Sequence, residues 1–176
     1  MIQPKHLIFI LRMFGNYLIK KGKHRSGFYF SPQFDIKHIK RKILFKENCI
    51  YKFGDIDDFD INKLFGVSFG MHHTNSVRFG WNIDDDEIGI YNYCYISGKR
   101  VMIKIVSIPT ETNFVFEIFI YDSYYELKIT DMNGKLIGWS EVSKPKTTKW
   151  GYHLFPYFGG NKVAPHNMEI CMKKIN

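Results

Sequence analysis

The sequence predicts an all-β protein, a two-sheet antiparallel β-sandwich of the jelly-roll kind, with a short helix near the N-terminus. Three observations support this fold class. The 176 residues include 16 Phe and 11 Tyr, and aromatic rings pack well on the pleated surface of a strand. Short β-rich runs recur between turn signals from residue 43 onward. Within these runs apolar and polar side chains alternate, as they do on a strand with one buried face.

The predicted elements follow in order along the chain. Apolar residues between Leu7 and Leu18 recur at the spacing of one helical face, which predicts the N-terminal helix within the first 20 residues. A helical turn over 60–64 could be capped by Asp60. Asn133-Gly134, between two β-rich runs, predicts a hairpin. The predicted strands cover residues 27–30, 42–45, 64–71, 76–83, 87–97, 101–108, 113–121, 124–130, 135–141, 152–156 and 167–172.

One domain is expected to span residues 1–176. A chain of this length buries about 70% of its unfolded surface on folding, and a hydrophobic content of 45% supplies a core. No Ser/Pro-rich linker, internal repeat or low-complexity stretch divides the chain. The apolar run 7–11 is interrupted by Arg12 and followed by no small-residue cleavage site, so we expect a cytoplasmic protein without a membrane partner. The sequence leaves the oligomeric state open.

Positive charge is concentrated in the N-terminal quarter. Residues 1–46 hold 11 Lys and Arg against the single acid Asp35, in a chain whose net charge is +8. Two basic clusters, 20–25 and 37–42, could attract nucleic acid or an acidic polysaccharide. The alternative is that their lysines protect the edge of a sheet from pairing with another chain.

Alternation along three neighbouring runs sorts their residues onto two faces. The isoleucines of 87–97 share one face, and Val77, Phe79 and Trp81 behave similarly in 76–83. If the runs are neighbours, the face away from the core carries His72, Arg78, Tyr91, Tyr93 and Tyr95 beside the small residues Ser68, Gly70, Ser76 and Gly80. This describes a shallow groove in which rings stack on a ligand and Arg and His donate hydrogen bonds. Alternatively, another segment covers this face and the tyrosines are interior.

Further binding candidates lie in loops. The stretch 151–167 is rich in aromatic residues and glycine, and it forms either a binding rim with Tyr157, Asn161 and His166 or simply a turn between the last two strands. Asn75 is an additional polar contact beside the groove.

Motifs for metal and cofactor chemistry are missing from the sequence. The adjacent residues His72 and His73 would point to opposite faces of a strand, which does not favour one shared metal. The acidic runs 55–60 and 84–87 lack the pattern of an EF-hand. No phosphate-binding loop, dinucleotide fingerprint or nucleophile elbow is present. We therefore expect neither a metal nor a cofactor.

The strand order, the tyrosine-lined sheet with His72 and Arg78, and the late aromatic strand resemble concanavalin-type jelly rolls. This group includes plant-type lectins, glucanases and alginate-lyase-like enzymes. In the lyase-like members the resemblance implies that Arg78 neutralises a uronate carboxylate, while His72 and one of Tyr91, Tyr93 or Tyr95 shuttle the proton of β-elimination. The stretches 69–81 and 154–162 are also similar to small uncharacterised bacterial proteins.

Three functions are consistent with these features, and we rank a binding protein ahead of an enzyme. The leading hypothesis is a carbohydrate-binding protein that recognises an oligo- or polysaccharide on the tyrosine-rich sheet face. The second is an adaptor that binds nucleic acid or protein through the basic N-terminal quarter. The third is a polysaccharide lyase acting on an acidic glycan, with His72, Arg78 and Tyr93 as the candidate catalytic residues. The ligand-binding candidates are Asn75, Tyr91, Tyr95, Tyr157, Asn161 and His166.

Overall fold

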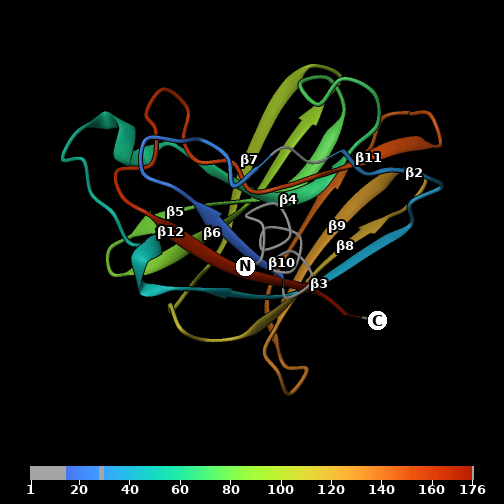
Figure 1. Cartoon of the computed structure of the whole chain (residues 1–176). Helices are drawn as coiled ribbons and strands as arrows, with labels where there is room; N and C mark the ends of the chain where they lie inside the picture. Colours follow the sequence, from blue (N-terminus) through green and yellow to red (C-terminus); the bar gives the residue numbers. More distant parts are fainter. Residues whose placement is uncertain (1–14, 28–29, 176) are drawn as a thin grey trace, which may run out of the picture.

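The computed structural model describes residues 15–27 and 30–175. Two six-stranded antiparallel sheets face each other (Figure 1). The first sheet has the order β1 (Asn16–Ile19), β12 (Met168–Lys174), β3 (His38–Phe45), β8 (Phe114–Ile120), β9 (Tyr124–Thr130) and β10 (Leu136–Ser143). The second sheet has the order β2 (Pro32–Phe34), β11 (Trp150–Leu154), β4 (Asn62–Ser68), β5 (Ser76–Asp84), β6 (Glu87–Ile96) and β7 (Lys99–Ile108). The predicted all-β, two-sheet antiparallel sandwich is confirmed.

The core lies between the inward faces of the two sheets. Val77, Phe79 and Trp81 of β5 are completely buried there. The Phe79 ring lies edge-on to Phe116 of β8, with their centroids 4.9 Å apart. The alternation read from the sequence thus separates the core side of β5 from its outer side, because successive side chains of a strand point to opposite faces.

The hairpin predicted at Asn133-Gly134 joins β9 to β10. Its turn is longer than two residues. The Asp131 carboxylate accepts hydrogen bonds from the backbone amides of Asn133 (2.8 Å) and Lys135 (2.9 Å). Gly134 has a φ of 84°, a conformation that glycine adopts without steric cost.

Several boundaries differ from the sequence prediction. Residues 16–19, assigned to the N-terminal helix, form β1 instead, because their backbone pairs with β12; the remainder of that predicted helix lies outside the described residues. The predicted strand 27–30 is replaced by β2, and residues 28 and 29 also lie outside the described part. Each of the other predicted strands overlaps an observed one.

The helical turn lies earlier than the sequence prediction placed it. The 3₁₀ turn Ile56–Phe59 is capped by the Asp55 carboxylate, which accepts from the Asp57 amide, and β4 already begins at Asn62. The other helix among the described residues is the 3₁₀ turn Glu47–Cys49. Neither turn is long or apolar enough to reach across a membrane.

Removal of the Phe79 ring should test the packing of the two sheets. Phe79→Ala leaves a cavity beside Phe65 and Phe116, and it should lower the free energy of unfolding by about 3–5 kcal/mol. Phe59→Ala is the control, because that ring is 74% exposed, and it should change stability by no more than about 0.5 kcal/mol. Urea unfolding curves of the two variants measure this difference, and equal effects would contradict the assigned core.

Candidate functional site

The outward side of the second sheet brings together the polar and aromatic residues singled out in the sequence. In the register of β5 and β6, Arg78 is opposite Tyr93, Gly80 is opposite Tyr91 and Ser76 is opposite Tyr95. We call this surface the tyrosine face and define it by its described members Lys63, Arg78, Tyr91, Tyr93, Tyr95, Tyr152 and Tyr157. The predicted juxtaposition of these β5 and β6 residues is therefore present in the structure.

Arg78 and Tyr93 form the floor of the tyrosine face. They are only 7% and 4% exposed, and the guanidinium carbon of Arg78 lies 5.5 Å from the centre of the Tyr93 ring. Nε of Arg78 is buried without a hydrogen-bond partner. Burial lowers the pKa of Arg78, because the surroundings disfavour its charged form. The floor therefore holds a largely desolvated cation with an unused hydrogen-bond donor.

Glycine keeps β4 close to this cation. A Cβ at Gly66 would overlap the backbone carbonyl of Val77 and the Cβ of Arg78. Gly66 is opposite Arg78 in the register of β4 and β5. Because a side chain at that position would collide with β5, only glycine allows the two strands to pair around Arg78.

Lys63 is a member of the tyrosine face that the sequence reading missed. Its ammonium group donates to the Gly159 carbonyl at 2.9 Å and lies 5.3 Å and 5.7 Å from the ring centres of Tyr93 and Tyr157. Burial, and then the charge of Arg78, lower the pKa of Lys63 to about 8. The ammonium group therefore lies where burial disfavours its charge, in contact with one carbonyl and two aromatic rings.

A bulge explains why alternation did not reveal Lys63. The register of β4 and β5 shifts between Lys63 and Gly66. Leu64 and Phe65 both belong to the buried core, although they are adjacent in the chain. A bulge that turns two successive residues inward leaves Lys63 on the outward side.

Two histidines border the tyrosine face in the turn after β4. Nδ1 of His72 is hydrogen-bonded to the Tyr152 hydroxyl at 3.3 Å. The His73 ring lies 5.0 Å from that of Tyr95, and the two histidine rings are 4.4 Å apart. The adjacent histidines do not alternate across a strand, because β4 has already ended at Ser68. Burial lowers the pKa of His72, which favours its neutral form.

The tyrosine face carries more positive than negative charge. Arg25 lies over the Tyr157 ring at 5.5 Å, and Arg100 and Lys104 of β7 are opposite Tyr95 and Tyr91. Lys104 is paired with Asp84 at 2.7 Å. Within residues 15–27 and 30–175, no salt bridge is made by Arg25, Lys63, Arg78 or Arg100.

The loop candidates separate into two groups. Tyr157 forms isolated β-bridges with Lys63 and Arg25 and therefore adjoins the tyrosine face. The Asn75 side chain accepts from the Ser97 amide at 3.1 Å, which ties the histidine turn to the β6–β7 turn. His166, by contrast, is hydrogen-bonded through Nε2 to the Asn48 carbonyl at 2.9 Å, and no contact within residues 15–27 and 30–175 places it on the tyrosine face.

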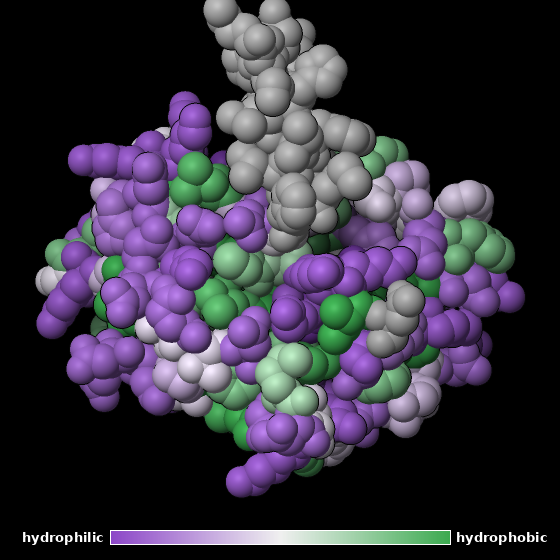
Figure 2. All heavy atoms as spheres, turned by 60° about the horizontal axis from the view of Figure 1, so that its bottom comes forward, coloured by the Kyte–Doolittle hydropathy of each residue, from purple (hydrophilic) through white to green (hydrophobic). Residues whose placement is uncertain are grey.

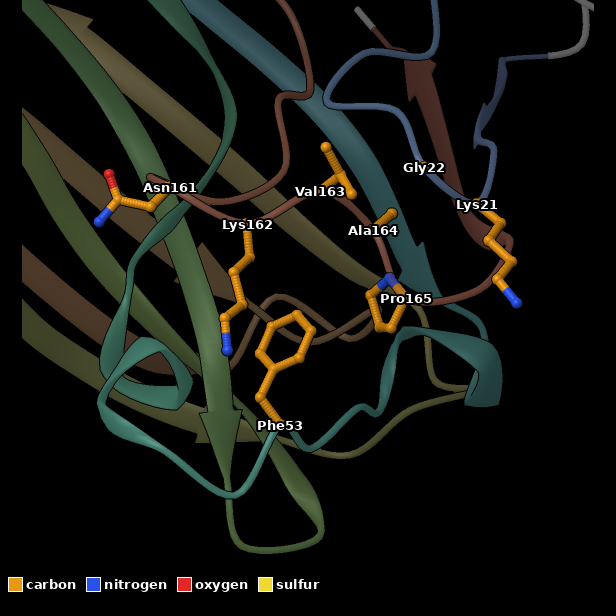
Figure 3. A pocket seen from close by; sticks show the side chains of 8 residues that line it. All are labelled: Lys21, Gly22, Phe53, Asn161, Lys162, Val163, Ala164 and Pro165. Carbon is orange, nitrogen blue, oxygen red and sulfur yellow. The ribbon is translucent and has the colours of Figure 1, made fainter.

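Asn161 lies at a different site, a shallow surface pocket of about 470 Å³. In Figure 3 the Phe53 ring faces Lys162 and Pro165. The Lys162 ammonium lies 4.7 Å from the centre of the Phe53 ring and is paired with Asp55 and Asp57. Its charge is therefore already compensated, and its contacts hold the loop around 53–58 against the loop around 159–165.

The two basic clusters lie away from the floor of the tyrosine face, except that His24 and Arg25 at the end of the first cluster contact the Tyr157 ring. Lys20, Lys21 and Lys23 are exposed in the loop after β1. In the second cluster, on β3, His38 and Lys40 are both paired with Glu117 of β8. On the side of the molecule seen in Figure 2, hydrophilic side chains divide the apolar ones into small patches.

Few other side chains among the described residues are candidates for a nucleophile, a metal ligand or a proton acceptor. Burial raises the pKa of the Cys49 and Cys94 thiols to about 12, which disfavours a thiolate nucleophile. Among the described residues, no three His, Cys, Asp or Glu side chains lie together in a way that could hold a metal. His72, hydrogen-bonded to Tyr152 beside a cationic surface, is the arrangement best suited to accept a proton.

Comparisons with known proteins identify the fold. No protein-family model matches the chain, and no curated protein matches its sequence. The alginate lyase from Klebsiella pneumoniae superimposes with a TM-score of 0.59 at 6% identity, over 77% of this chain and 56% of that one. A functionally unknown protein from Saccharomyces cerevisiae gives a TM-score of 0.57 at 10% identity, over 90% and 85% of the two chains.

A third similar structure is the CBM2 module of an evolved Dit from the Lactobacillus casei BL23 phage J-1. Its TM-score is 0.50 at 8% identity, over 91% of this chain and 76% of that module. At these identities the likeness establishes the fold. The chain is a two-sheet antiparallel β-sandwich, which confirms the jelly-roll resemblance at the level of fold.

The lowered pKa of Lys63 predicts how stability depends on pH. Between about pH 8 and the ordinary lysine pKa near 10.4, the unfolded chain binds a proton at Lys63 that the folded protein lacks. The contribution of Lys63 to the free energy of unfolding should therefore increase as pH rises through this window. Urea unfolding of the protein and of Lys63→Met at pH 8 and pH 10 measures it. If the difference in free energy of unfolding between the unchanged protein and Lys63→Met is the same at both pH values, the burial of this ammonium group is contradicted.

Proposed function

We propose that the protein binds an oligo- or polysaccharide on the tyrosine face, and that this glycan carries anionic groups such as carboxylates. The observation that carries the proposal is the buried Arg78, whose Nε has no partner and which lies beside a second cation, Lys63. Leaving a buried donor unsatisfied costs about 1–3 kcal/mol. An anion bound near the floor would offset the repulsion between the two cations.

The aromatic rings supply the second half of the recognition. Tyr91 and Tyr95 are half-buried, so each still exposes part of its ring above the floor. Aromatic rings stack on the apolar C–H face of a sugar, while guanidinium groups bind carboxylates through paired hydrogen bonds. Since Arg78 is deeply set, the more exposed Arg100 and Tyr95 would meet the glycan directly, and Arg78 would act through its charge from below.

Relatives of similar fold support a glycan as the ligand. Two structures of similar fold are an alginate lyase, whose name refers to a glycan, and a CBM2 module. Fold likeness alone does not transfer an activity, so the proposal depends on the residues of this chain. Those residues combine rings with uncompensated cations, which suits an acidic glycan better than a neutral one.

The hydrogen-bonded His72 and Tyr152 favour a second candidate function, a lyase for the same class of glycan. In β-elimination a base takes the proton next to the uronate carboxylate, a carbon–carbon double bond forms, and the glycosidic oxygen leaves with a proton from an acid. A neutral His72 could accept the first proton, and Tyr152 would then be the acid candidate in place of Tyr93, which is on the floor. An increase in ultraviolet absorbance from the unsaturated product tests this step directly.

Loss of one exposed cation should reveal the binding site. Arg100→Ala removes a charge-assisted hydrogen bond worth about 1.5–3 kcal/mol, and affinity for polygalacturonate or alginate should therefore fall about tenfold or more. Tyr95→Ala should also weaken binding. Lys173→Ala is the matched control, because it removes an exposed cation from β12 of the other sheet, and it should leave affinity nearly unchanged. Isothermal titration calorimetry at low and high salt measures the affinity of all three variants.

Three other ligands test the alternatives in the same assay. Neutral xylan should bind more weakly than polygalacturonate, and equal affinities would contradict the role of the cations. A single-stranded DNA oligonucleotide tests the adaptor hypothesis, since cations and rings together also suit nucleic acid. Binding of DNA alone, abolished by changes at Lys20, Lys21 and Lys23 and insensitive to Arg100→Ala, would replace the proposed function with the adaptor.

A further inference from the structure

An exposed aromatic cluster lies at the edge of the second sheet, where β2 and β11 pair (Figure 1). Phe30, Phe34 and Trp150 are 70%, 53% and 63% exposed. Phe34 and Trp150 are opposite each other in the register, and their ring centres are 5.3 Å apart. We call these three residues the aromatic edge. Exposed rings gathered in one place are typical of a binding surface, because each keeps a large apolar area in contact with water.

The aromatic edge continues the tyrosine face. Alternation along β11 places Trp150, Tyr152 and Leu154 on the same side. A Cβ at the intervening Gly151 would contact the side chains of Phe69 and Val67, which belong to the core. The Phe30 ring lies 6.1 Å from that of Tyr152, whose hydroxyl is hydrogen-bonded to His72. Trp150 thus lies on the outward side of the sheet, as Arg78 does.

Register gives the separation between the two parts of this surface. Leu154 is opposite Gly66, which is in turn opposite Arg78. Trp150 is four residues from Leu154 along β11, about 13 Å in the strand direction, and β5 lies two strands from β11, about 10 Å across the sheet. A ligand that contacts both the aromatic edge and the region of Arg78 must therefore be an extended chain.

The two parts differ in chemistry. Tyr93 and Tyr157 have cations over their rings, whereas no cation–π contact involves Phe34 or Trp150 among the described residues. The nearby Asp35 is paired with Lys37 at 3.2 Å. One part of the surface therefore offers uncompensated charge, and the other offers bare aromatic rings.

We propose that the aromatic edge is a second subsite for the same glycan, where Trp150 and Phe34 stack on a sugar ring beyond those held by the cations. This inference rests on the proposed function and specifies its ligand as a polymer that binds more tightly as its chain lengthens. A sugar ring suits the edge because its C–H face covers the aromatic rings while its hydroxyl groups remain in water.

The edge strand itself argues against pairing with a second copy of this chain. β2 has only three residues, and one of them is Pro32. Proline lacks the amide donor that an added strand would need, and short edge strands with proline resist edge-to-edge association. A sugar polymer needs no such backbone pairing.

Chain-length dependence of binding tests the inference. For the unchanged protein, octagalacturonate should bind at least about tenfold more tightly than digalacturonate, since stacking contacts add to the charged ones. Trp150→Ala should abolish most of this gain and leave the affinity for digalacturonate unchanged. Trp139→Ala is the matched control, because that ring is 52% exposed on β10 of the other sheet, and it should preserve the gain. Calorimetry with both oligomers provides the affinities.

The possible results separate this inference from the proposed function. If Trp150→Ala and Trp139→Ala show the same chain-length gain as the unchanged protein, the second subsite is refuted while glycan binding at the cations stands. If neither oligomer binds the unchanged protein, the proposed function fails and the inference with it. If Trp150→Ala leaves the gain unchanged but converts a dimer into a monomer in sedimentation, the aromatic edge is an interface between copies.

Discussion

The alternation of β5 is the constraint on which the rest of the site depends. Phe79 must point inward because its ring fills the space between the sheets beside Phe116. Arg78, its neighbour in the chain, must then point outward, toward Tyr93 of β6. Gly66 lets β4 pair closely at this position. Packing of the core thereby fixes a cation under an aromatic ring on the opposite side of the same sheet.

The electrostatics of the tyrosine face follow from this placement. Burial disfavours the charges of Arg78 and Lys63, and the charge of Arg78 further lowers the pKa of Lys63. Contacts with the Tyr93 ring recover part of that cost, since cation–π contacts of desolvated groups contribute about 2 kcal/mol. What remains is an excess of positive charge among aromatic rings, and no carboxylate of the described residues forms a salt bridge with either cation. The proposed acidic glycan would supply both the missing charge and an apolar surface for the rings.

Much of this arrangement could be predicted from the sequence. Alternation over two hairpin-connected strands, with Asn92 as the one polar exception on the core side, placed Arg78, Tyr91, Tyr93 and Tyr95 on one face. Lys63 could not be found in that way, because it was assigned to a helical turn before the predicted strand, and because the bulge in β4 breaks the period of two. Asn161 and His166 were grouped with the site by their position in one aromatic loop, but their contacts lie with other loops.

The N-terminal strand β1 shows a different limit of prediction from the sequence. The apolar spacing up to Leu18 suits a helix, yet residues 16–19 pair with β12 as a strand. Four residues are too few for their own periodicity to distinguish the two structures. Hydrogen bonds to a partner that is distant in the sequence decide the outcome. The contact between His72 and Tyr152 likewise joins residues far apart in the chain, and no local pattern indicates it.

The side-chain Nε–H resonance of Arg78 provides the most direct test of the account. In a ¹⁵N-resolved NMR titration with octagalacturonate, this resonance and the ring signals of Tyr93 and Tyr95 should shift together, with the same apparent dissociation constant. A titration in which they remain fixed, while signals of Lys20, Lys21 and Lys23 shift, would contradict it and locate anion binding in the basic loop after β1.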